Sequence, residues 1–155
     1  LLWLFVKNVH TIRIIFIEQW KMETTCMTNE EMLAYGKMLT QYWSTFLLRG
    51  DLWAGKTTIT KGIAQWLGID PNSVQSPTYT YINIYEEKLL HIDMRRIENE
   101  KQLHTLGLLD LIEQYSYIVI EWPKREKNYA DSTWQDISIQ ILDQWRICLQ
   151  KPRSL

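Results

Sequence analysis

This sequence has few glycines and cysteines, and neither sign of charge is in clear excess. Its 155 residues include two cysteines and six glycines. Glycine is thus about 4% of the chain, against about 7% in an average protein. Cys26 and Cys148 lack metal-ligand spacing and disulfide-rich surroundings, so a secreted disulfide scaffold is excluded and a reducing, cytoplasmic setting is expected. The formal net charge of -1 supplies no broad attraction to nucleic acid, so any such contact must be local or made through a partner.

Long apolar runs are also missing. LLWLFV and IIFI near the N-terminus each fall well short of the ~20 apolar residues that span a membrane. No basic start and small-residue cleavage site accompany them, so a signal peptide is a poor fit. We expect translation to begin at Met22 or Met27, and residues 1–21 to be upstream sequence or a disordered extension outside the fold. Residues 22–151 are then expected to form one domain and 152–155 a tail.

What the sequence does contain is an alternation of helix and strand patterns. Thr28 and Glu31 form a capping box, which predicts a helix over about 29–42. The other predicted helices span about 57–67, 98–106 and 108–115, and the predicted strands span 45–49, 79–85, 89–93, 117–122, 136–142 and 145–150, with a loop over 124–135. This order predicts an α/β fold, with a mixed and mostly parallel central sheet flanked by helices and an antiparallel C-terminal hairpin.

The segment GDLWAGKTT, residues 50–58, has the Gly-x-x-x-x-Gly-Lys-Thr spacing of a phosphate-binding loop. It lies between a predicted strand and a predicted helix, which disfavours the alternative of a glycine turn before an ordinary helix. In such a loop, backbone N–H groups and the helix N-terminus converge on phosphate. Lys56 would neutralise the β- and γ-phosphates, and the Thr57 hydroxyl would bind Mg²⁺.

Two acidic residues, Asp93 and Glu121, end apolar predicted strands downstream of this loop. A P-loop enzyme needs such a carboxylate to hold its metal, directly or through water. For each residue alone, a solvated carboxylate at a strand end is an equally good interpretation. His91 shares a strand face with Asp93 but no third ligand accompanies them, so we interpret His91, like His10 and His104, as structural.

Several segments, taken in order, resemble the TsaE family, also called YjeE, from about Thr28 to about Leu149. These are GDLWAGKTT (50–58), SPTYT (76–80), HIDMRRI (91–97), LGLLD (106–110) and IEWP (120–123). The family comprises small bacterial P-loop ATPases required for threonylcarbamoyladenosine, the modified nucleoside beside the anticodon of tRNAs that read codons starting with A. The resemblance implies a P-loop NTPase-like fold, ATP and Mg²⁺ as cofactors, and a cytoplasmic protein without membrane association.

The resemblance also implies partners. Family members are weak ATPases alone and act with the TsaD–TsaB pair, which installs the threonylcarbamoyl group. ATP hydrolysis is thought to reset that complex between turnovers, and tRNA would be met only through the complex. From the residues alone, two other classes stay open: a different small P-loop enzyme such as a kinase or GTPase, and a nucleotide-dependent module that does not hydrolyse. The absence of an Asn-Lys-x-Asp motif and of an arginine-rich lid counts against GTPase and kinase respectively.

The resemblance assigns site residues position by position. It implies Lys56, Asp93 and Glu121 as catalytic residues and Thr57, Glu121 and Asp93 as metal ligands. SPTYT would be a switch-like segment near the γ-phosphate, although a Ser-Pro turn into a strand explains it equally well. Trp122 would lie beside the active site, or plug a strand end. The implied nucleotide-binding residues are Gly50, Asp51, Leu52, Trp53, Ala54, Gly55, Lys56, Thr57, Thr58, Thr78, Thr80 and Trp122.

Trp53 departs from the family, which would have glycine there. Glycine is also common in the family near Trp43, Trp66 and Trp145, with Trp134 a weaker case, and the chain has eight tryptophans. We hypothesise that some of these are UGA codons that the source organism reads as glycine; the alternative is a divergent, tryptophan-rich homologue. A UGG codon at position 53 would rule the hypothesis out. A genuine Trp53 either swings outward or, if φ > 0 is required, strains the loop by about 1–3 kcal/mol.

A second departure is Arg95, which stands where the family usually has tyrosine. Pairing with a carboxylate or a phosphate is one interpretation, but we favour an exposed cation at a strand end. Lys124, Arg125 and Lys127 form a small basic cluster that we interpret as a solvated loop rather than a tRNA contact.

Overall fold

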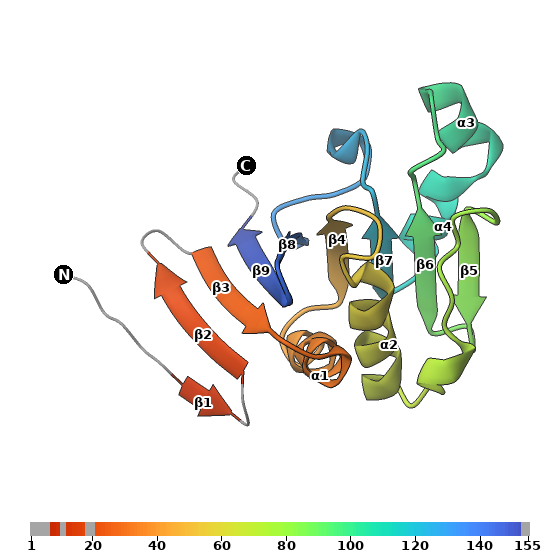
Figure 1. Cartoon of the computed structure of the whole chain (residues 1–155). Coiled ribbons are helices and arrows are strands. Elements are labelled where there is room, and N and C mark those ends of the chain that lie inside the picture. The colour runs from red at the N-terminus through yellow and green to blue at the C-terminus, as the bar shows by residue number, and fades with distance from the viewer. Residues whose placement is uncertain (1–6, 10–11, 18–20, 153–155) are drawn as a thin grey trace.

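The computed structural model describes residues 7–9, 12–17 and 21–152 as one nine-stranded sheet with helices packed against it (Figure 1). The strands are β1 (Lys7–Val9), β2 (Ile12–Ile17), β3 (Lys21–Cys26), β4 (Thr45–Arg49), β5 (Ile82–Tyr85), β6 (Leu89–Asp93), β7 (Tyr117–Glu121), β8 (Gln135–Leu142) and β9 (Trp145–Pro152). The helices are α1 (Asn29–Leu39), α2 (Lys56–Trp66), α3 (Glu100–Thr105) and α4 (Leu108–Gln114), with short 3-10 turns at Pro71–Ser73 and Glu126–Asn128.

The sheet has a parallel centre and antiparallel margins. Its strand order is β1-β2-β3-β9-β8-β4-β7-β6-β5. Pairing is parallel between β8 and β4, between β4 and β7, and between β7 and β6, and antiparallel elsewhere. The carboxyl ends of β4, β7 and β6 therefore meet at one edge of the sheet. The predicted mixed α/β fold and the C-terminal hairpin of β8 and β9 are confirmed.

Alternating side chains of the central strands supply two cores, one on each face. From β4, Phe46 and Leu48 pack into the core that contains residues of α1 and α2, whereas Leu47 packs into the core that contains residues of α3 and α4. The period of two in a strand sends neighbouring residues to opposite faces, so a strand covered on both sides reads as a continuous apolar run. In the described part of the chain, no helix combines the length and the apolar character needed to cross a bilayer.

The structure differs from the expectation that residues 1–21 lie outside the fold. Lys7–Val9 and Ile12–Ile17 form strands, and Arg13 to Ile17 pair antiparallel with β3. The β-branched run from Ile12 suits a strand, and pairing satisfies the backbone groups that β3 would otherwise expose at the sheet edge. The rest of the 1–21 segment, including His10, and most of the 152–155 tail lie outside the described residues.

Three predicted elements are three residues shorter than expected, and one of them is the helix predicted over 98–106, which spans Glu100–Thr105. The first helix ends at Leu39 because the N–H groups of Gln41 and Tyr42 turn back to the carbonyls of Met38 and Leu39. The strand predicted to begin at residue 79 begins at Ile82. Before it, the Tyr81 N–H bonds to the Pro77 carbonyl at 2.7 Å and Tyr81 has a φ of 66°, so residues 77–81 form a turn.

Helices α1 and α2 approach each other at two glycines. A Cβ atom on Gly36 would lie 2.2 Å from the carbonyl oxygen of Ile59, and one on Gly62 would lie 2.0 Å from that of Leu33. Both contacts are with backbone, which cannot move aside as a side chain tip can. The close approach sets the position of α2, and with it the loop that precedes α2.

We expect Gly62→Ala to lower the free energy of unfolding by about 2 kcal/mol, because the added methyl group forces the two helices apart. Denaturant titration measures this change. Gln65→Ala, at an exposed position of the same helix, is the control and should change the value by less than about 0.5 kcal/mol. Equal stability of the Gly62→Ala variant and the parent would show that the helices do not pack this closely.

Candidate functional site

The loop between β4 and α2 has the backbone that its spacing predicts. Gly50 and Gly55 both have positive φ, 150° and 105°, and α2 begins immediately afterwards at Lys56. A Cβ atom on Gly50 would lie 2.8 Å from the Ile139 carbonyl oxygen, so the close approach of β8 also requires glycine there. The predicted strand, glycine loop and helix are thus confirmed in that order, and the helix N-terminus opens onto the loop.

Lys56 is held inside this loop. Its ammonium group donates to the carbonyls of Gly50 and Asp51, both at 2.8 Å, and lies 4.5 Å from the centroid of the Trp122 ring. Burial lowers the pKa of Lys56, and the nearby carboxylates of Glu121 and Asp93 oppose that shift. The loop therefore contains a positioned cation next to backbone N–H groups.

Glu121, the last residue of β7, connects the loop to the sheet. Its Oε1 atom accepts a hydrogen bond from the Thr57 hydroxyl at 2.9 Å and lies 2.9 Å from His91 Nε2. Burial alone would raise the pKa of Glu121, but the hydrogen bonds from His91 and Thr57 and the charge of Lys56 hold it below its ordinary value. The buried carboxylate is therefore ionised, and its Oε1 atom takes part in both hydrogen bonds.

His91 is a part of this site that the sequence interpretation did not include. The side chain is fully buried, and among the described residues nothing bonds to its Nδ1. Nε2 faces a carboxylate oxygen of Glu121, so this ring nitrogen carries a proton and donates a hydrogen bond to Glu121. The sequence places His91 two residues before Asp93 in a predicted strand, but it does not show that this strand lies beside the one that ends in Glu121.

Asp93 organises the loops around the site rather than lining its cavity. It is buried, its Oδ2 accepts from the Thr78 hydroxyl at 2.7 Å, and its Oδ1 accepts from the Arg95 N–H at 2.7 Å. These bonds draw Thr78 to the site, whereas the Thr80 hydroxyl donates to Asn83 at 3.1 Å and lies outside the cavity lining. Of the two threonines predicted to contact phosphate, the structure brings in only Thr78.

A cavity of about 990 Å³ lies over the loop and is lined by most of the predicted site residues. Its lining includes the seven residues 52–58 together with Thr78, Arg95, Glu121 and Trp122. It extends past the start of α1 to Gln144 and Arg146 of the hairpin. Among the described residues no group of three His, Cys, Asp or Glu side chains could hold a metal ion. A metal here would therefore need oxygen ligands beyond these side chains.

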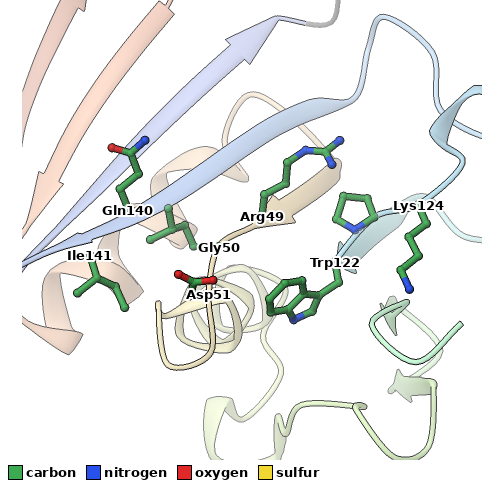
Figure 2. A pocket seen from close by; sticks show the side chains of 9 residues that line it. Arg49, Gly50, Asp51, Trp122, Lys124, Gln140 and Ile141 are labelled. Carbon is green, nitrogen blue, oxygen red and sulfur yellow. The ribbon is translucent and has the colours of Figure 1, made fainter. Parts of the chain in front are cut away.

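A second cavity of about 600 Å³ lies beside the loop, where β8 faces Trp122 (Figure 2). Gly50 and Asp51 line this cavity and not the larger one. Arg49 also lines it, but its guanidinium is bonded to Asp136 at 2.9 Å and to Glu126. Since those bonds join β4 to β8 and to the 126–128 turn, we place the functional site in the larger cavity.

Trp53 lies at the tip of the loop and points away from it. The side chain is 90% exposed, and its φ of 65° is in the left-handed region that favours glycine. An indole this exposed is not packed into the loop, whose Ala54 N–H bonds to the Asp51 carbonyl at 3.2 Å. Trp43, Trp66, Trp134 and Trp145 do not have positive φ. Trp134 is 4% exposed and packs edge-on against Tyr129, so of these five tryptophans only Trp53 has a backbone conformation that favours glycine.

The glycine loop, the helix behind it and the parallel strands beside it define an α/β protein of the P-loop NTPase class. A family model, described as threonylcarbamoyl adenosine biosynthesis protein TsaE, matches residues 26–148, and the chain belongs to this family. The crystal structure of YdiB from Bacillus subtilis is similar, with a TM-score of 0.63 and 23% identity over 94% of this chain and 90% of that one. That likeness supports the fold.

Curated relatives carry the name tRNA threonylcarbamoyladenosine biosynthesis protein TsaE. The Haemophilus influenzae protein is 40% identical over 81 residues, which are 50% of this chain and 51% of that protein. The Bacillus subtilis protein is 44% identical over 78 residues, 48% of each chain. The chain thus spans about half the length of these relatives. The Rickettsia typhi protein is 30% identical over 112 residues, 70% of this chain and 77% of that one.

The opposite backbone environments of two tryptophans give a test. We expect Trp53→Gly to raise the free energy of unfolding by about 1 kcal/mol, because glycine adopts the left-handed conformation without a Cβ clash. Trp66→Gly is the matched control and should lower it by about 1 kcal/mol or more, since Trp66 lies in the last turn of α2. Thermal unfolding of both variants measures the signs, and a loss of stability in both would exclude strain at Trp53.

Proposed function

We propose that this protein binds ATP with Mg²⁺ and hydrolyses it in support of tRNA N6-threonylcarbamoyladenosine formation, in a cytoplasmic complex with TsaD and TsaB homologues. The observation that carries the proposal is the hydrogen bond between Thr57 of the phosphate loop and Glu121 of β7, beside the buried ammonium of Lys56. The family and the names of the relatives support the pathway. tRNA would be met through the complex, since the net charge of -1 offers no broad attraction to it.

The residues present fit a magnesium ion. Thr57 Oγ1 and Glu121 are oxygen donors 2.9 Å apart, and Mg²⁺ is commonly held by one or two protein oxygens together with water and phosphate. The Thr57 proton points to Glu121, which leaves the lone pairs of Oγ1 available to a cation. When bound, Mg²⁺ would neutralise charge on the phosphate oxygens. Asp93 does not line the cavity, and its two oxygens accept from Thr78 and from the Arg95 backbone, so we assign it the positioning of Thr78 rather than direct metal ligation.

The remaining residues bind and orient the nucleotide. Backbone N–H groups of the loop and of the start of α2 would receive the phosphates. Lys56 would exchange its bonds with the Gly50 and Asp51 carbonyls for phosphate oxygens. In hydrolysis a water oxygen bonds to the γ-phosphorus, the bond from that phosphorus to the β-phosphate oxygen breaks, ADP leaves with the electron pair, and the water loses a proton to solvent. Thr78, whose hydroxyl donates to Asp93, would accept a hydrogen bond from that water and so orient it.

Phosphate release from ATP, measured with and without TsaD and TsaB homologues, tests the proposal. We expect slow release by the protein alone, stimulation by the partners, and a loss of about 100-fold in Lys56→Ala, because the phosphates lose their positioned cation. Lys88→Ala, in the exposed turn between β5 and β6, is the control and should leave the rate unchanged.

Two results would contradict the proposal in different ways. ATP binding without any phosphate release, even with the partners, would indicate a nucleotide-dependent module that does not hydrolyse. Transfer of the phosphoryl group to another small molecule in place of water would indicate a kinase-like enzyme.

A further inference from the structure

Arg95 follows the end of β6 and also lines the larger cavity, the one over the phosphate loop. It lines the cavity together with Thr78, Glu121 and Trp122. Its guanidinium carbon lies 5.5 Å from the centroid of the Trp122 ring, the ring that Lys56 Nζ also approaches. Arg96, the next residue, lies against Tyr79 instead, 5.3 Å from that ring centroid, and does not line the cavity.

The backbone of Arg95 is fixed from both sides. Its N–H donates to Asp93 Oδ1 at 2.7 Å, and its carbonyl accepts from Lys124 Nζ at 2.8 Å. The same ammonium group bonds the Ile97 carbonyl at 2.6 Å, which ties down the rest of the turn after β6. A side chain that starts from a fixed backbone loses less freedom when it binds a ligand, so its contacts cost less entropy.

The charges around Arg95 leave room for an anion. Burial is the main cause that lowers the pKa of Lys56, but the guanidinium of Arg95 lowers it too, so the two cations act on each other. The nearby carboxylates are already engaged: Asp93 by Thr78 and the Arg95 backbone, and Oε1 of Glu121 by Thr57 and His91. Within the described part of the chain, no hydrogen bond or ion pair occupies the guanidinium.

We propose that Arg95 binds the terminal phosphate of ATP, the group that distinguishes ATP from ADP. The inference rests on the proposed function and adds a residue to the same site. The planar guanidinium can donate two parallel hydrogen bonds to phosphate oxygens, and it brings a full charge to the part of the cavity where Lys56 approaches Trp122.

Affinity for ATP and for ADP, each measured with Mg²⁺ by titration calorimetry, separates this role from a general one. We expect Arg95→Ala to weaken ATP binding about tenfold while ADP binding changes less than about twofold, since only ATP has the phosphate that the guanidinium contacts. Arg95→Lys, which keeps the charge without the fork, should show an intermediate loss for ATP. Arg96→Ala is the matched control and should bind both nucleotides as the parent does.

Equal effects of Arg95→Ala on ATP and ADP, or no effect on either, would overturn the inference while leaving nucleotide binding intact. Failure of the parent protein to bind either nucleotide would overturn the proposed function, and this inference with it. The rate of phosphate release at saturating ATP gives a second measurement. If Arg95 contacts the transferred group, Arg95→Ala should lower kcat as well as the affinity for ATP.

Discussion

The site depends on the compensation of one buried charge, the carboxylate of Glu121. An ionised carboxylate away from water is costly unless charges and hydrogen bonds compensate it. Thr57 and His91 provide those bonds from α2 and β6, and the ammonium of Lys56 provides the charge. One side chain thus joins the phosphate loop to two strands of the sheet, and moving any of the three elements would leave the charge uncompensated.

The parallel pairing of the central strands brings these groups together. Leu48 of β4 lies opposite Glu121 of β7, and Asp93 of β6 lies opposite Glu121 on the other side. Two backbone hydrogen bonds continue this order past the strand ends. The Trp122 N–H donates to the Leu48 carbonyl, and the Met94 N–H donates to the backbone carbonyl of Glu121. The chain then leaves each strand beside the cavity, at the carboxyl edge where open α/β sheets bind ligands.

Much of this arrangement could be predicted from the sequence because it follows from local patterns. The spacing of Gly50, Gly55 and Lys56 identified the loop, and the apolar runs before Asp93 and Glu121 marked two strand ends at its edge. Side-chain partners across strands could not be predicted, because one sequence does not show which residues face each other. The bonds that Asp93 makes to Thr78 and Arg95, and the bond of His91 to Glu121, belong to that second kind.

The dependence of ATP affinity on Mg²⁺ tests the central role of Glu121 most directly. Affinity would be measured for the parent protein and for Glu121→Gln, which keeps an oxygen for Thr57 and His91 but removes the charge. We expect Mg²⁺ to raise the ATP affinity of the parent about tenfold or more and to have little effect on the variant. An equal response to Mg²⁺ in both proteins would contradict the assignment of Glu121 to the metal.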